Sequence, residues 1–95
     1  MPRKLKVRNC RRIEGERLFK PSGVRGCELI IEDLMLDEFE ALRLCDYDGL
    51  SQIEAAEAMG ISRGTVQRLL GSGRKKMVDV LLHQKGLTLH QPAEE

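Results

Sequence analysis

Residues 62–76 carry arginine, glutamine and lysine side chains, and those at 63, 67 and 68 are expected on the outer face of a helix, with a basic surface continuing at 74–76. An arginine can donate two hydrogen bonds to guanine O6 and N7, and a glutamine can pair similarly with adenine N6 and N7. Arg63, Gln67 and Arg68 are therefore candidates for reading bases in DNA. Phosphate groups are expected to be held by Gln52, Arg74, Lys75 and Lys76. Gly64 has no side chain, so it would let the helix backbone approach the DNA closely. The predicted chemistry is recognition, without a catalytic residue or a cofactor.

The segment 52–71 has the residue pattern of a helix-turn-helix. Ser51 and Glu54 form a capping box that starts the first helix of the motif. Ala56 is small enough for the second helix to cross closely, and Gly60 can adopt the positive φ of a tight turn. Ser62 then caps the second helix, whose first turns would project toward the DNA major groove.

Another helix is predicted before the motif, from Leu36 to about Asp46, because apolar residues recur there at three-residue spacing. Its outward residues are expected to be Glu38, Glu40 and Arg43. The inner face of this helix is expected to consist of Leu36, Phe39, Leu42 and Cys45. The inner face of the helix that follows Ser51 is expected to consist of Ile53, Ala56 and Met59.

The last helical segment is predicted to run from Ser62 to about His83 along an apolar stripe. Gly71 and Gly73 interrupt that stripe, at a cost of about 1 kcal/mol each relative to alanine. We therefore expect a kink or a break that divides the segment into two helices, and we expect Gly86 to close it. The stripe consists of Val66, Leu69, Leu70, Met77, Val78, Leu81 and Leu82.

The remaining segments are short and favour extended backbone. Strands are expected near 17–20, at 29–31 and at 87–89, with a turn at 21–23, and the last two strands could pair. The fold class is therefore mainly α, a helix-turn-helix domain with a basic extended N-terminal arm and one or two short strands. The expected divisions are a basic arm at 1–26, a DNA-binding domain at 27–86, and a C-terminal strand and tail at 87–95.

The net charge of +1 conceals an alternation of charge along the chain. Residues 1–26 carry nine basic residues against two acids, residues 27–61 ten acids against one arginine, and residues 62–86 six basic residues against one acid. Two basic blocks on either side of an acidic one indicate that both ends of the chain could bind a polyanion such as DNA. The alternative interpretation is that the basic blocks only make the protein surface soluble. The arm residues expected to contact the DNA backbone or minor groove are Arg3, Lys4, Lys6, Arg8, Arg11 and Arg12.

The three cysteines indicate reduced thiols in the cytoplasm, since an odd number without a C-x-x-C pair argues against a disulfide framework. Cys45 is expected in the core. A metal site formed by Cys10 and Cys27 with His83 or His90 stays open as an alternative of unusual spacing. No apolar run reaches the length of a membrane span, and no catalytic constellation is recognisable, so we expect neither a membrane protein nor an enzyme.

Several longer motifs carry a family resemblance. The run from LDEFEALRL to GSGRKKM resembles region 4 of sigma-70-type factors. The wider set RRIE, FKPSGV, LDEFEALRL, SRGTVQRLL, RKKMVDVLL and KGLTL resembles domain-of-unknown-function family 134, the UPF0251 group of small prokaryotic proteins taken to bind DNA. The resemblance implies a helix-turn-helix-like helical domain, and a recognition helix that includes Ser62, Arg63, Thr65 and Arg68. The chain departs from the family pattern at Met35, Gly64, Gly71 and Gly73.

These features together predict a sequence-specific DNA-binding protein that regulates transcription, with double-stranded DNA as its partner. A homodimer formed through residues 77–82 or through the strand-like ends, and a contact with RNA polymerase, are further candidate interactions. The alternative is a protein-interaction module that docks on the transcription machinery through its acidic face.

Overall fold

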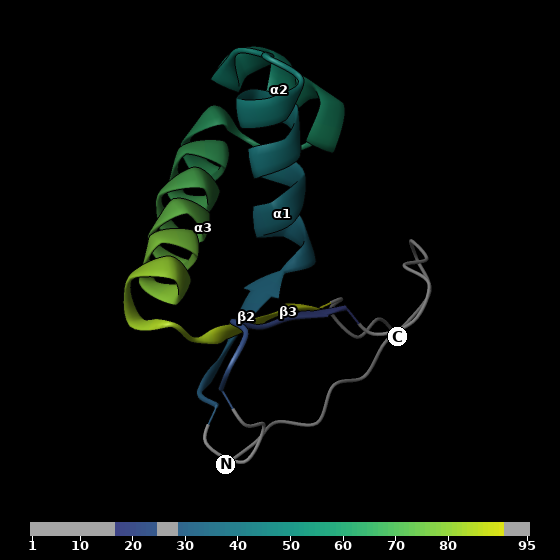
Figure 1. Cartoon of the computed structure of the whole chain (residues 1–95). Helices are drawn as coiled ribbons and strands as arrows, with labels where there is room; N and C mark the ends of the chain where they lie inside the picture. Colours follow the sequence, from purple (N-terminus) through teal and green to yellow (C-terminus); the bar gives the residue numbers. More distant parts are fainter. Residues whose placement is uncertain (1–16, 25–28, 91–95) are drawn as a thin grey trace.

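The computed structural model describes residues 17–24 and 29–90, which form a mainly α fold with a small sheet at one end (Figure 1). The mainly α prediction with short strands is confirmed. Within the described part of the chain, no helix combines the length and the apolar character that crossing a lipid bilayer requires. The elements in chain order are β1 (Leu18–Phe19), β2 (Ile31–Met35), α1 (Leu36–Leu42), the π-helical turn η2 (Arg43–Tyr47), α2 (Gln52–Met59), α3 (Arg63–His83) and β3 (Gly86–His90).

The helix starts follow the predicted caps. Ser51 and Glu54 exchange hydrogen bonds: the Glu54 amide donates to Ser51 Oγ over 3.1 Å, and the Ser51 amide donates to Glu54 Oε1 over 2.9 Å. The Thr65 amide donates to Ser62 Oγ over 3.1 Å, so Ser62 caps α3. These bonds satisfy amides that a helix terminus leaves without intrahelical partners.

The predicted helix from Leu36 to Asp46 exists, but it widens to a π-turn in its second half. The Asp48 amide donates to the carbonyl of Arg43, five residues earlier, over 2.8 Å. The prediction that Glu38 faces outward is wrong, because its side chain is buried and only 5% exposed. A buried carboxylate is tolerated where several donors surround it, and Glu38 has such donors.

The inner face of α2 also differs from the predicted one. Ile53, expected inside, is 59% exposed, whereas Ala55 is completely buried beside Ala56. Two adjacent small side chains allow neighbouring helices to approach closely, and the core cluster that forms there also includes Ala41, Leu44, Val66 and Leu70. Cys45 packs against this cluster, as predicted.

Helix α3 is a single continuous helix of 21 residues, so the predicted break at Gly71 and Gly73 is wrong. Gly73 is buried where α1 crosses α3, and a Cβ at that position would lie 3.1 Å from Leu42 Cδ1. The glycine therefore permits close helix packing. The helix ends at Gln84 with a φ of 55°, and not at Gly86, which lies buried at the start of β3.

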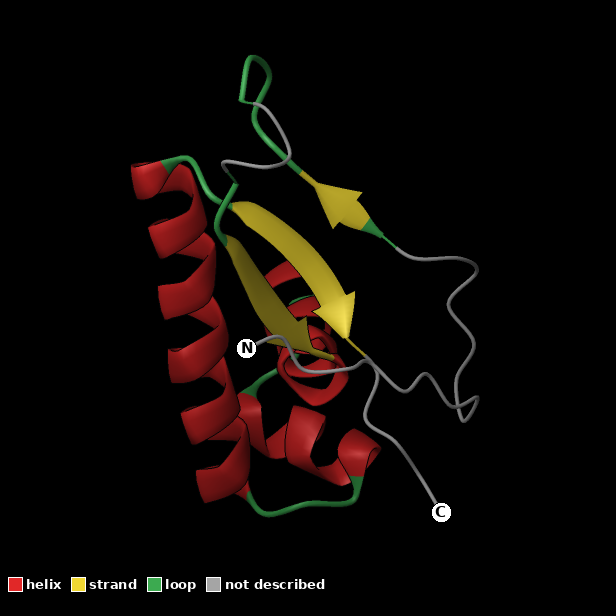
Figure 2. Cartoon of the chain, turned by 90° about the horizontal axis from the view of Figure 1, so that it is seen from below, coloured by secondary structure: helices red, strands yellow, loops and turns green. Residues whose placement is uncertain are grey.

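The three strands form a sheet in the order β1-β3-β2, beside α1 and α3 (Figure 2). Strand β2 pairs with β3 in parallel, with Leu34 opposite Leu89, and β1 pairs with β3 in antiparallel orientation. The predicted strands near 17–20 and at 87–89 and the pairing of the last two strands are thus confirmed, whereas the strand expected at 29–31 begins only at Ile31 and runs to Met35. Because β3 is the central strand, residues 86–90 belong to the same structural unit as the helices.

Candidate nucleic-acid interface

The connection between α2 and α3 has the geometry that the sequence predicts for a tight interhelical turn. Gly60 adopts a φ of 71° and a ψ of 33°, and its amide donates to the carbonyl of Ala56 over 2.9 Å. A left-handed residue at this position favours glycine, because a Cβ would approach the following carbonyl. Ile61 then packs against the core cluster and anchors the turn.

The inward residues of α3 determine which residues face outward. Val66 and Leu70 are fully buried in the core cluster of α1, η2 and α2. A helix turns 100° per residue, so Arg68 lies roughly opposite these two side chains and Gln67 lies to one side. Arg63 shares the side of Leu70, but it is the first residue of the helix and remains exposed. The three predicted base-reading side chains are therefore all exposed in the first turns of α3.

These three side chains keep their hydrogen-bond donors available. Within residues 17–24 and 29–90, the side chains of Arg63, Gln67 and Arg68 form no hydrogen bond or ion pair. Gly64 lies between them, and a Cβ there would meet nothing within 4 Å. The start of α3 thus presents two guanidinium groups and one amide around a bare stretch of helix backbone.

Ser62 and Thr65 occupy a different role at this terminus. Their hydroxyl oxygens lie 2.9 Å apart, and the Thr65 amide also binds Ser62 Oγ. Both residues therefore hold the first turn of α3 in place. Gln52 lies at the first position of α2, where its side chain is half-buried.

Arg74 is exposed on α3, as predicted, but its guanidinium is paired within the fold. Its guanidinium donates two hydrogen bonds to Asp46, from Nε to Oδ2 over 3.1 Å and from Nη2 to Oδ1 over 2.7 Å. These hydrogen bonds lower the pKa of the Asp46 carboxyl and raise the pKa of Arg74, as expected for a bidentate charged pair. Arg74 consequently joins α3 to η2.

Lys76 lies on the inner side of α3, and this corrects its expected place on the outer surface. Its Nζ lies 2.8 Å from Glu38 Oε1 and donates to the carbonyl of Asp33 over 2.8 Å. Glu38 also accepts hydrogen bonds from the Ser72 hydroxyl and the Met35 amide. Since the Lys76 donors are used inside the fold, we leave this residue out of the proposed DNA contacts.

The Glu38 carboxylate is the centre of this buried polar cluster. Burial by itself raises the pKa of Glu38, but hydrogen bonds from Lys76, Ser72 and the Met35 amide together outweigh burial, so the pKa lies below its usual range. Glu38 is therefore ionised in the folded protein at neutral pH. Sequence reasoning missed this cluster and the Asp46–Arg74 pair because their partners lie 38 and 28 residues apart. The only sequence signal was the opposite charge of the two blocks.

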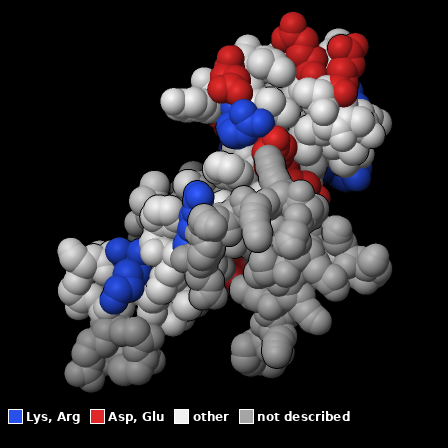
Figure 3. Space-filling model, turned by 90° about the vertical axis from the view of Figure 1, so that its right-hand side faces the viewer, with Lys and Arg blue, Asp and Glu red and all other residues white. Residues whose placement is uncertain are grey.

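Acidic side chains gather at the end of the molecule formed by η2 and α2 (Figure 3). Exposed members of this group are Asp46, Asp48, Glu54 and Glu57. Two of them already pair with arginines, since Asp48 binds Arg43 and Asp46 binds Arg74. The acidic end therefore has part of its charge compensated within the fold.

Several predicted contacts lie outside the described residues. These are the arm residues and two of the cysteines: Arg3, Lys4, Lys6, Arg8, Cys10, Arg11, Arg12 and Cys27. Within the described residues, no group of three or more histidine, cysteine or acidic side chains is arranged to hold a metal ion.

Comparison with known proteins finds relatives that match most of this chain, while the matched segment covers between about half and nearly all of each relative's own length. The UPF0251 protein of Shewanella baltica is 44% identical over 95 residues, which cover 100% of this chain and 97% of the relative. The UPF0251 protein of Ruminiclostridium cellulolyticum is 43% identical over 89 residues, or 94% of this chain and 68% of the relative. A relative in Methanococcus maripaludis is 49% identical over 69 residues, or 73% of this chain and 53% of its own length. No solved structure matches the chain. Because the family model "Protein of unknown function DUF134" matches residues 1–92, the chain belongs to this family, which includes the UPF0251 proteins.

Proposed function

We propose that this protein is a sequence-specific DNA-binding protein that regulates transcription by inserting the start of α3 into the major groove. The observation that carries the proposal is the exposed row of Arg63, Gln67 and Arg68, whose donors have no partner among the described residues. The major groove admits an α-helix, and these side chain types make the specific paired contacts with guanine and adenine.

The surroundings of this row support the same proposal. Val66 and Leu70 fix the rotation of α3 about its axis, so the three side chains reach the groove in a defined order. Gly64 lets the helix backbone lie close to the DNA. Lys75 is exposed two turns further along α3, where it can contact a phosphate, and Gln52 can do the same from the start of α2.

A homodimer forms part of the proposal. A single module of this size buries only about 600–1,000 Å² of protein surface on DNA, so a second copy would increase affinity and define a symmetric site. Val78 and Leu82 supply exposed apolar surface near the end of α3, far from the row that contacts DNA.

The proposal can be tested by selecting bound sites from a random DNA pool and measuring affinity by fluorescence anisotropy. Arg68→Ala should weaken binding to the selected site by about 1–3 kcal/mol, and should relax base preference at one position. Lys75→Ala is the matched control, which should weaken all sequences alike. An equal loss on every sequence for Arg68→Ala would make Arg68 a phosphate contact, and failure to select any DNA would overturn the proposal.

A second candidate function rests on the acidic end formed by η2 and α2 (Figure 3). Glu54 and Glu57 are exposed there and have no ion-pair partner among the described residues. They could dock on a basic surface of the transcription machinery, such as RNA polymerase. Selection of a DNA site separates the two functions, and the DNA affinity should fall steeply with salt because phosphate contacts release counterions. Loss of polymerase binding on charge reversal at these two residues, without selectable DNA binding, would favour the second function.

A further inference from the structure

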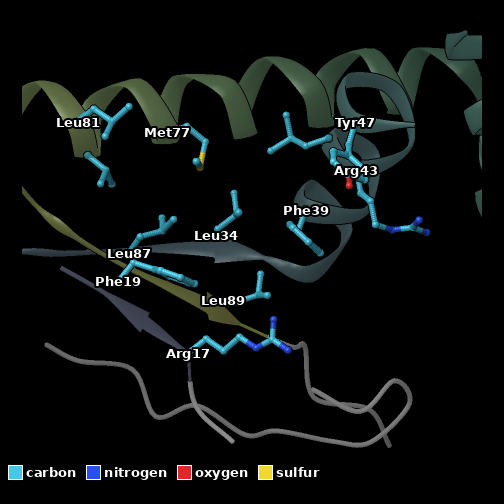
Figure 4. A pocket seen from close by; sticks show the side chains of 12 residues that line it. Arg17, Phe19, Leu34, Phe39, Arg43, Tyr47, Met77, Leu81, Leu87 and Leu89 are labelled. Atoms are coloured by element: carbon cyan, nitrogen blue, oxygen red, sulfur yellow. The ribbon is translucent and has the colours of Figure 1, made fainter. Parts of the chain in front are cut away.

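An apolar pocket of approximately 640 Å³ lies between α3, α1 and the sheet (Figure 4). Leu34 and Leu87 belong to its sheet side, and Met77 and Leu81 extend toward it from α3 (Figure 4). Protein interiors rarely leave hollows larger than a water molecule, whereas small-molecule sites measure about 300–1,000 Å³. The pocket is open to solvent on one side, where Phe19 and Leu81 are 59% and 77% exposed, and its volume falls within the small-molecule range.

The lining determines which chemistry the occupant can have. Ten of the twelve lining residues are apolar or aromatic, so they offer dispersion contacts and almost no hydrogen bonds to a polar body. Phe39 and Leu89 lie on the side toward α1 and β3 (Figure 4). The body of an occupant must therefore be hydrocarbon.

Two arginines are among the lining residues, and only one of them is available to bind an anionic group of a ligand. Arg43 is held on both sides, by Glu40 over 2.8 Å and by Asp48 over 3.0 Å. Arg17 forms no ion pair with any described residue, and its exposed side chain ends beside Leu89 (Figure 4). Its backbone carbonyl accepts a hydrogen bond from the Leu89 amide over 3.4 Å, so the residue is attached to β3 at the pocket.

We propose that this pocket binds a linear alkyl carboxylate, with the hydrocarbon chain among the apolar side chains and the carboxylate on Arg17. An arginine can hold a carboxylate through two parallel hydrogen bonds. The volume lies within the range of small-molecule sites, and the one cation of the lining that is unpaired among the described residues supplies a single polar partner, as a molecule with one charged end requires. This inference does not depend on DNA binding.

The single tyrosine of the chain provides a direct measurement. Tyr47 lies at the rim of the pocket, where it is 85% exposed, and the protein has no tryptophan, so a change in intrinsic fluorescence would arise at this rim, and calorimetry measures binding itself. Octanoate, decanoate and dodecanoate should be titrated into the delipidated full chain below their micelle concentrations, with calorimetry for stoichiometry. We expect one molecule per chain, and an affinity that rises roughly 10-fold with each added pair of methylenes.

Two pairs of variants assign the two parts of the ligand. Val80 lines the pocket from α3, so Val80→Phe should fill it and remove the binding of both dodecanoate and dodecanol. Ala58→Phe is the control, because Ala58 is exposed on α2 outside the pocket. Arg17→Gln should lower dodecanoate affinity at least 10-fold while leaving dodecanol unchanged. Lys20→Gln, an exposed neighbour that does not line the pocket, should change neither.

Three results would overturn the proposal that the pocket binds an alkyl carboxylate. Absence of saturable binding of all three carboxylates would overturn the proposal, and so would binding that survives Val80→Phe in a folded protein. A dimer that Val80→Phe dissociates, without any carboxylate binding, would assign the pocket to a second copy and also overturn it. If Val80→Phe lowers the melting temperature too far for a titration, the comparison of Arg17→Gln with Lys20→Gln still decides, because Arg17 is exposed.

Discussion

The inner and outer faces of α3 contain residues of the same types in different roles. Lys75 is exposed on the outer face, while its neighbour Lys76 donates to Glu38 and to the carbonyl of Asp33 inside the fold. Gly71 lies in open space, while Gly73 lies under Leu42 of α1. Residue type alone therefore does not assign a role on a helix. One or two positions along the helix rotate a side chain by 100° or 200° and exchange solvent for a packed neighbour.

The largest difference in stability between substitutions on the two faces is expected at Lys75 and Lys76. Lys76→Met should destabilise the protein by about 3 kcal/mol, because it leaves the Glu38 carboxylate buried without its charged partner. Lys75→Met should change the free energy of unfolding by less than about 0.5 kcal/mol, as exposed substitutions usually do. Urea denaturation of both variants measures the contrast, and equal values would show that Lys76 also acts as a surface residue.

The glycines should show opposite signs. Gly73→Leu should destabilise the fold by about 2 kcal/mol, because the added side chain must displace Leu42 and separate α1 from α3. Gly71→Ala should stabilise it by about 0.5–1 kcal/mol, since alanine is a better helix former and nothing lies within 4 Å of the new Cβ. Thermal denaturation gives both values. Destabilisation by Gly71→Ala would indicate that this position is packed in solution.

Acidification should act on the inner face of α3. The folded-state pKa of Glu38 is lowered, as is that of Asp46, so the folded state favours the ionised carboxylates. Their contribution to stability is present above the carboxyl pKa of the unfolded chain, about 4, and is lost as the pH falls through the lower folded-state pKa. The free energy of unfolding should therefore decrease with acidification in this range. Glu38→Gln should flatten the profile, and an unchanged profile would exclude Glu38 as a source.

The smallest difference concerns DNA, and it depends on the proposed function. Lys75→Gln should reduce the slope of log affinity against log salt by about 1, as the loss of one phosphate contact does. Arg74→Gln should reduce the slope less, because Asp46 already holds the Arg74 guanidinium. Anisotropy titrations at several salt concentrations provide both slopes. A larger effect of Arg74 would mean that the ion pair opens on DNA.

The amino-acid sequence by itself determined the local features of the candidate site. The caps at Ser51 and Ser62 and the left-handed turn at Gly60 are as predicted. Their interactions join atoms at most four residues apart, so the types and spacing of a few residues suffice to identify them. The exposed row of Arg63, Gln67 and Arg68 was predictable for a related reason, since burial of Val66 and Leu70 fixes the phase of the helix.

Only the tertiary structure decided which long-range partners complete the fold. Leu42 packs over Gly73 within the continuous helix α3, and Lys76, on the inner side of this helix, binds Glu38, which is 38 residues away. The central position of β3 likewise depends on strands from distant parts of the chain. The apolar pocket exists because β1, β3, α1 and α3 meet there. Contacts of this kind arise only when the chain closes on itself, because periodicity identifies an apolar face but not the residue that will cover it.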